Sequence, residues 1–276
     1  MIILEFGEAF RKIRLGRGIS QEDLAKDLFS RETISKIESG KIYCPRANYD
    51  VLLERLGVSD LEFKYIQANY SFTPKEKILY QLLDISHSTE TNKIEQLLKK
   101  CSKIENDSDI ERISLILQAD LIISKDHDIE KAKKLVQPIW YNHLQKFKLL
   151  TINDIYILNM IAYAFDNVTN QEIISKVLDE IDKHYPFLKS LKCSVLINSA
   201  SLYLDNHNFA AAKTSLTKAA AIAKANHQYD KLLLCQAEIA ICNHDILHAN
   251  HYAKLLEEIG ADHIAPALKS EIESFS

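Results

Sequence analysis

The sequence predicts an all-α protein, and glycine usage, composition and helix caps each support this fold class. Five of the six glycines lie between Gly7 and Gly57, and only Gly260 lies beyond them. A sheet-rich domain needs glycines at hairpin turns and bulges. The long remainder is instead rich in Leu, Ile, Lys, Glu and Ala and shows no convincing period-2 alternation. The pattern therefore predicts helices joined by polar turns.

Three helix starts can be identified from their N-terminal caps. Each has a serine or threonine hydroxyl followed three residues later by a carboxylate, which satisfies free backbone amides and meets the positive end of the helix dipole. The pairs are Ser20 with Asp23, Ser59 with Glu62, and Thr73 with Glu76. Pro74 strengthens the third start, because proline is favoured at the first helical position. We expect a connecting helix over residues 61–70, and domains over residues 1–70 and 71–276.

The composition is that of an ordinary globular protein. Hydrophobic residues make up 47% of the 276 residues and charged residues 26%, which is enough to bury a core. The formal net charge of −4 argues against a protein that coats nucleic acid, although a local DNA-reading surface needs only a few placed cations. The N-terminus lacks a signal peptide, and no apolar stretch reaches the roughly 18–20 residues of a membrane span. We expect a cytoplasmic protein without a membrane partner.

Residues 19–42 carry the pattern of a helix-turn-helix motif. They predict helices over residues 21–28 and 31–39, joined at Phe29 and Ser30, with a preceding helix over residues 7–15. The apolar positions that pack these helices together are Leu24, Ala25, Leu28, Ile34 and Ile37, with Phe10 and Ile13 from the preceding helix. A three-helix surface of mixed charge is the alternative.

The second helix of the motif is the candidate recognition helix. Ser30 caps it, and its outward-facing N-terminal residues are placed to enter the major groove. An arginine there can donate two hydrogen bonds to guanine, and Gln21 can donate to a phosphate from the start of the first helix. The candidate DNA-binding residues are Gln21, Arg31, Glu32, Thr33, Ser35, Lys36 and Lys41. Arg11, Arg14 and Arg17 add positive charge nearby, and some of them are expected to be solvated surface.

The rest of the chain contains a weak internal repeat. Small and aromatic residues there follow the spacing of a tetratricopeptide repeat, in which small residues let two antiparallel helices approach closely. The residues are Ala200, Tyr203, Phe209, Ala212, Leu216 and Ala219, with poorer copies after Ala237 and around residues 129–132 and 173–181. We expect a right-handed superhelix of tetratricopeptide-like hairpins. A nonrepetitive helical bundle is the alternative.

Cysteines and histidines do not predict a metal site or an enzyme. The five cysteines are widely spread without a CxxC pair, so we expect reduced thiols, with an intersubunit disulfide as an alternative for Cys44. His244 and His248 have a zinc-compatible spacing but lack the glutamate of HExxH, and the repeat places an interhelical turn over residues 243–246. Phosphate-binding and nucleophile motifs are also missing from the sequence. We expect neither catalytic activity nor a cofactor.

The segment ISQEDLAKDLFSRETISKIESGK, followed by LLERLGVSDLEF, resembles the start of Rgg/MutR-type regulators and of related PlcR-type receptors. In this group a five-helix domain of the Cro/repressor type is fused to tetratricopeptide-like helices. The resemblance is specific over residues 1–72 and looser beyond them. It implies a cytoplasmic homodimer on a palindromic operator in double-stranded DNA. Many members of the group sense imported signalling peptides in quorum sensing.

The same resemblance implies candidate peptide-binding residues. Receptors of the group hold an extended peptide on the concave face of the repeats with asparagine and glutamine side chains. The segments IYILNMIAYAF and SVLINSASLYLDN resemble the inner helices and indicate Asn159 and Asn198, and LCQAEIAI indicates Gln236. One carboxamide can satisfy both a peptide N–H and a C=O. The alternative is that these amides bond neighbouring helices or water.

We therefore predict a sequence-specific transcriptional regulator whose repeat domain receives a short linear peptide. One alternative is a regulator whose repeat domain serves only as a dimerisation and protein-docking scaffold. A second is a toxin–antitoxin or phage-type repressor, although such chains are usually much shorter.

Overall fold

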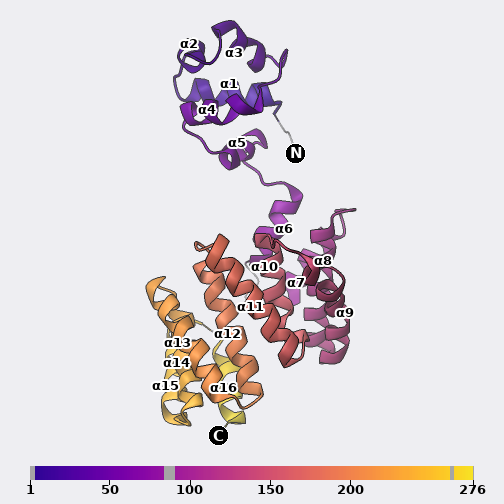
Figure 1. Ribbon diagram of the computed structural model, residues 1–276, viewed down its shortest axis with the longest axis vertical. Helices are drawn as coiled ribbons and strands as arrows, with labels where there is room; N and C mark the ends of the chain where they lie inside the picture. Colours follow the sequence, from indigo (N-terminus) through magenta and orange to yellow (C-terminus); the bar gives the residue numbers. More distant parts are fainter. Residues whose placement is uncertain (1–3, 84–90, 262–263, 276) are drawn as a thin grey trace. The chain divides into compact units, whose positions relative to one another are not determined.

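The computed structural model describes residues 4–83, 91–261 and 264–275 (Figure 1). Within these ranges it contains sixteen α-helices and no strand, so the predicted all-α class is confirmed. The chain divides into two compact units, Met1–Tyr80 and Gln81–Ser276. None of the helices in the described ranges is both long and apolar enough to cross a membrane.

Five short helices build the core of the first unit. They are α1 (Phe6–Gly16), α2 (Gln21–Ala25), α3 (Arg31–Glu38), α4 (Arg46–Leu56) and α5 (Asp60–Gln67). Their common core contains Phe10, Leu24, Ile34, Leu52 and Phe63, none more than 1% exposed. The predicted packing of the two motif helices against the preceding helix is therefore confirmed.

The predicted N-terminal caps are confirmed by their hydrogen bonds. The Ser20 hydroxyl accepts from the Asp23 amide at 3.0 Å, and the Ser59 hydroxyl accepts from the Glu62 amide at 3.1 Å. At the start of α6 (Pro74–Leu83), the cap is reciprocal. There the Thr73 hydroxyl accepts from the Glu76 amide at 3.2 Å, and the Glu76 carboxylate accepts from the Thr73 amide at 2.8 Å.

The first motif helix ends earlier than predicted. We expected it to reach residue 28, but α2 ends at Ala25, because Asp27 adopts a left-handed conformation with φ of 60°. The amides of Leu28 and Phe29 then both donate to the Ala25 carbonyl at 2.9 Å. This turn brings the side chains of Leu28 and Phe29 against the core of the unit.

The connecting helix and the boundary also differ from the expected positions. Instead of running over residues 61–70, α5 ends at Gln67, since Asn69 and Tyr70 take left-handed φ values of 53° and 57°. The first unit extends to Tyr80 rather than to residue 70. Aromatic contacts explain the extension, because the Phe72 ring lies 4.8 Å from that of Tyr65 and 4.4 Å from that of Tyr80.

The second unit is a succession of antiparallel helices. They are α7 (Thr91–Cys101), α8 (Ser108–Leu121), α9 (Ile129–Asn142), α10 (Ile152–Ile161), α11 (Asn167–His184), α12 (Lys189–Asp205), α13 (Phe209–Ala225), α14 (Tyr229–Cys242), α15 (Ile246–Glu258) and α16 (Ala265–Ser274). Figure 1 shows α13, α14 and α15 lying side by side, and each helix from α12 to α16 packs against the next.

The predicted repeat positions coincide with the helix contacts. Ala200 on α12 and Ala212 and Ala219 on α13 are completely buried, as are Ala249 and Ala253 on α15. Side chains this small allow the backbones of paired helices to come close together. Tyr203 and Phe209 pack against the same core from its margin.

Histidines stand where glycine would be expected at the ends of the repeat helices. His207, His227 and His244 follow α12, α13 and α14, each with a left-handed φ between 55° and 57°. The residue after each histidine donates its amide back into the preceding helix, for example from Asp245 to the Ala240 carbonyl at 2.9 Å. This explains how the second unit forms tight interhelical turns with almost no glycine.

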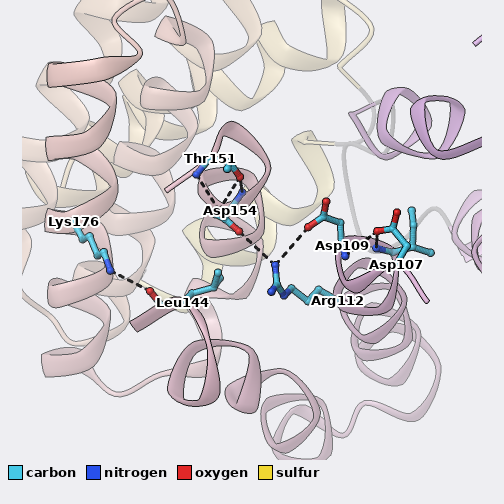
Figure 2. A network of polar contacts seen from close by, with 8 residues as sticks. Asp107, Asp109, Arg112, Leu144, Thr151, Asp154 and Lys176 are labelled. Carbon is cyan, nitrogen blue, oxygen red and sulfur yellow. Dashed lines mark hydrogen bonds and ion pairs between the residues drawn. The ribbon is translucent and has the colours of Figure 1, made fainter. Parts of the chain in front are cut away.

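A polar network joins α8 to α10 (Figure 2). Arg112 Nη1 lies 3.5 Å from a carboxylate oxygen of both Asp109 and Asp154. Asp154 also accepts hydrogen bonds from the amide and the hydroxyl of Thr151, at 2.9 Å and 2.7 Å. The side chain of Asp154 therefore both caps α10 and ties it to α8. On the other side of α10, the Lys176 ammonium donates to the Leu144 carbonyl at 3.1 Å.

Candidate DNA-binding and ligand-binding sites

The predicted recognition helix, α3, separates an exposed polar side from a buried apolar side. Ile34 and Ile37 are buried in the unit's core. The Ser30 hydroxyl accepts from the Thr33 amide at 3.2 Å and lies 3.0 Å from the half-buried Thr33 hydroxyl. The predicted contact residues Arg31, Glu32, Ser35, Lys36 and Lys41 are all exposed. This arrangement leaves their polar groups available for a DNA groove and backbone.

A buried ion pair behind α3 was not predicted. The Glu38 carboxylate accepts from Arg14 Nε at 2.5 Å and from Arg14 Nη2 at 3.0 Å, and the two side chains are 3% and 8% exposed. Arg14 also donates to the Ile19 carbonyl at 2.8 Å. The grouping of Arg14 with Arg11 and Arg17 as surrounding positive charge was therefore wrong for Arg14. Its spacing of four residues from Phe10 is the signal that places it on the core side of α1.

Gln21 belongs to the same network. Its amide donates to Glu38 Oε2 at 2.8 Å, so one of its two N–H donors is already committed. The second N–H donor of the amide remains for a phosphate contact, which stays a prediction. The network joins α1, α2 and α3, and it thereby sets the position of the recognition helix.

Arg55 from α4 is a second residue that the sequence did not reveal. Its guanidinium donates to the Leu24 carbonyl at 2.9 Å and to the Lys26 carbonyl. These are carbonyls that the early end of α2 leaves without helical partners. Arg55 therefore stabilises the turn between the two motif helices, and no local pattern around residue 55 indicates this.

In the second unit, Asn159 and Asn198 lie together. The Asn198 amide donates to the Asn159 Oδ1 at 3.1 Å, although 39 residues separate them in the sequence. Both line a cavity of about 770 Å³ whose walls come mainly from α10, α12 and α14. Asn198 is exposed, and Asn159 is half-buried. Two of the three candidate peptide-binding residues are thus brought to one surface.

Gln236 is not brought there. The residues of α14 that line the cavity are Asp230, Lys231 and Leu234, and Gln236 is not among them. A step of two residues turns a helix by about 200°, which places Gln236 on another side of α14 from Leu234. The structure therefore does not bring Gln236 together with Asn159 and Asn198 at this cavity.

The cavity contains polar groups that the sequence did not single out. The Tyr163 hydroxyl is buried and has no hydrogen-bond partner in the described part of the chain. Asp120 lines the same cavity, and burial raises its pKa from 3.8 to about 7. Its charge also contributes to a raised pKa of the Tyr163 phenol. These groups give a mostly apolar surface several specific hydrogen-bonding positions.

The histidine-rich segment after α14 has local structural partners. His248 Nδ1 lies 2.7 Å from the carboxylate of Asp245, which also caps α15. The His244 ring packs against Phe209, with centroids 5.2 Å apart. The turn between α14 and α15 covers residues 243–245, one residue fewer than the predicted 243–246, because Ile246 is the first residue of α15. Each of these histidines thus has a role in the turn itself.

Known proteins resemble both the N-terminal part of this chain and the chain as a whole. A family model described as a helix-turn-helix domain matches residues 5–64. No curated protein matches the sequence. Solved structures match over nearly the whole chain. A candidate transcriptional regulator from Listeria monocytogenes EGD-e has 17% identity and a TM-score of 0.74, covering 99% of this chain and 98% of that one.

Two further structures are named for what they bind. The SHP pheromone receptor Rgg2 of Streptococcus dysgalactiae has 15% identity and a TM-score of 0.70, covering 99% of this chain and 100% of that one. PlcR of Bacillus thuringiensis, in complex with the peptide PapR7 and DNA, has 18% identity and a TM-score of 0.65, covering 94% and 98%. Residues 5–64 thus form a helix-turn-helix domain, the kind of domain that binds DNA. Its whole-chain fold is that of Rgg2 and PlcR, which confirms the resemblance seen in the sequence.

Proposed function

We propose that this protein is a homodimeric, sequence-specific transcriptional regulator whose second unit binds a short linear peptide. The observation that carries the peptide proposal is the Asn159–Asn198 pair at the wall of a large cavity. A peptide needs alternating donors and acceptors along its length, and carboxamides supply both. Apolar lining residues such as Tyr156, Met160 and Ile197 would contact its side chains.

Similar structures support the proposal. PlcR is described in complex with a peptide and DNA, and ComR from S. thermophilus is described in complex with DNA and its signalling peptide ComS. PrgX is described in a complex with cCF10. This chain shares their fold over nearly its entire length.

One observation favours the scaffold alternative. The two asparagines hydrogen-bond each other, and such a pair can simply hold α10 against α12. In that case the second unit would serve for dimerisation and protein docking alone. Replacing both asparagines separates the two proposals, because only a peptide receptor loses a response to ligand.

We expect Asn159→Ala combined with Asn198→Ala to abolish peptide binding while leaving basal DNA binding and thermal stability nearly intact. The experiment screens a library of linear peptides of five to ten residues for binding to the full chain by calorimetry. It then measures operator selection from a random DNA pool with and without the peptides that bind. Asn206→Ala is the matched control, since Asn206 also pairs with an asparagine across two helices, at 2.9 Å from Asn167. Normal peptide binding by the double variant would contradict the proposed site, and its unfolding would support the scaffold.

A further inference from the structure

The cavity that contains the asparagines continues into a second one of about 680 Å³ between α12, α14 and α16. The residues that line both are Ile197, Asn198, Ser201, Asp205, Leu234 and Ile264. A chain held by its backbone at Asn198 would therefore extend directly into the second cavity. The charged side chains that line this second cavity determine which ligands it can bind.

The charged side chains that line the two cavities are mostly acidic. They are Asp120 and Asp230 in the first, Glu238 and Glu271 in the second, and Asp205 in both. The only lysine or arginine among the lining residues is Lys231. Within the described residues, none of the five acids forms an ion pair. A low-dielectric hollow lined by one sign of charge concentrates ligands of the opposite sign.

Three of these acids form a cluster in the second cavity: Asp205, Glu238 and Glu271. Glu238 is 3% exposed, and its Oε2 has no hydrogen-bond partner in the described part of the chain. Burial and the charge of Glu271 raise the pKa of Glu238 well above its usual range. Burial and the charge of Asp205 raise the pKa of Glu271 to about 7. A carboxylate buried without a counterion is unfavourable, and a bound cation would relieve that cost.

The surrounding residues do not supply that cation. The Lys231 ammonium donates to the Ser194 hydroxyl at 2.8 Å and lies in the first cavity rather than the second. His207 lines the second cavity, and its ring packs against Phe209 and Phe275, with centroids 6.0 Å away in each case. Among the described residues, no group of three or more His, Cys, Asp or Glu is arranged to hold a metal ion. The three acids are therefore not arranged around a metal ion, which favours an organic cation as their ligand.

We infer that Asp205, Glu238 and Glu271 form a subsite for a positively charged group of the ligand, either an ammonium or a guanidinium. The inference rests on the proposed peptide-binding function and deepens it, because it makes the ligand a cationic peptide. The charged group is a lysine or arginine side chain or the peptide's own N-terminus. Asn159 and Asn198 bind the backbone, and the acidic cluster selects the charge.

A small probe tests the subsite directly. N-acetyl-arginine amide carries one guanidinium, and N-acetyl-citrulline amide is its neutral counterpart. At pH 8, above the pKa of Glu271, we expect the arginine probe to bind the full chain and the citrulline probe not to bind, in calorimetric titration. Glu238→Gln combined with Glu271→Gln should weaken binding at least tenfold. Glu273→Gln, an exposed position on the same helix as Glu271, is the matched control and should bind normally.

Equal binding of the two probes, or unchanged binding by the double variant, would overturn the inference. A loss of binding by the double variant can be distinguished from misfolding. Because the variant lacks unpaired buried charge, its melting temperature at pH 8 should be higher than that of the parent protein. A spectrum of native helicity and a single melting transition at or above that of the parent protein would verify this.

A randomised heptapeptide library identifies the source of the charge. Free and N-acetylated versions are selected on the full chain. Enrichment of lysine or arginine at one position in both versions indicates a side chain, and enrichment only in the free version indicates the N-terminus. Bound peptides without either charge would overturn the inference while leaving the proposed function intact. Binding of the arginine probe with no peptide bound would support the subsite while contradicting the proposed peptide receptor.

Discussion

Arg31 is the first residue of α3, and its guanidinium is exposed and makes no ion pair or hydrogen bond among the described residues. We expect Arg31→Ala to lose about 1–3 kcal/mol of discrimination at one base pair, because a bidentate contact to guanine would disappear. The measurement is the sequence preference of purified protein, selected from a random DNA pool. Lys26→Ala, an exposed residue outside α3, is the control. An unchanged preference for Arg31→Ala would show that another residue of α3 reads that position.

Asp120 gives the protein a defined pH dependence. Burial raises its pKa from 3.8 to about 7, so the folded state holds a proton that the unfolded state has already lost between these pH values. Stability should therefore fall as pH rises from about 4 to 7. Asp120→Asn should be more stable than the parent protein by about 2 kcal/mol at pH 8, with little difference at pH 4.

Urea unfolding at several pH values measures this difference. Glu111→Gln, an exposed position on the same helix as Asp120, is the matched control and should follow the parent protein. If the free energies of unfolding of Asp120→Asn and the parent protein differed by the same amount at pH 4 and pH 8, a raised pKa of Asp120 would be contradicted.

At the scale of the elements, the crossing of α1 and α3 depends on Gly7. A Cβ at this position would clash with the backbone carbonyl oxygens of Ile37 and Glu38. We expect Gly7→Ala to destabilise the first unit by about 1–3 kcal/mol, since one helix must move away from the other. The displacement would also move the recognition helix and weaken DNA binding.

Gly16→Ala provides the matched comparison, because it lies on the same helix and a Cβ there would meet no atom within 4 Å. It should be neutral or stabilising by roughly 0.5–1 kcal/mol, the helix propensity difference between the two residues. Thermal melting of both variants and operator titration measure the two effects. Equal stability of the two variants would argue against a close helix crossing at Gly7.

At the scale of the whole molecule, the weak charge of the DNA-reading segment predicts a dimer. Residues 1–48 carry nine Lys and Arg against seven Asp and Glu, a net of +2 (9 − 7), and the buried Arg14–Glu38 pair adds nothing outward. One such segment offers few phosphate contacts, so tight binding requires two. We expect a twofold dimer on a palindromic site, with half-sites about 34 Å apart or a multiple of that. Light scattering on and off DNA measures the assembly, and a monomer in both conditions at micromolar concentration would contradict it.

Local signals made much of this protein predictable. The hydroxyl caps at Ser20, Ser30, Ser59 and Thr73 and the buried alanines of the repeats were identified because capping and helix packing depend on residues three or four positions apart. The exposed face of the recognition helix follows from the same periodicity. The all-α class, the helix-turn-helix motif and the repeats were therefore determined by the sequence itself.

Tertiary structure decided what depends on distant partners. Arg14 is buried because Glu38, 24 residues away, compensates its charge. The helix α2 can end at Ala25 because the Arg55 guanidinium donates a hydrogen bond to the free carbonyl of Leu24. Gln236 lies off the cavity because the packing of α14 sets which side faces inward. The acidic cluster draws on α12, α14 and α16, whose acids are ordinary surface residues in the sequence. In each case the deciding contact comes from another helix. For Arg14 and the acidic cluster the physical reason is burial, since the cost of a buried charge depends on every element packed around it.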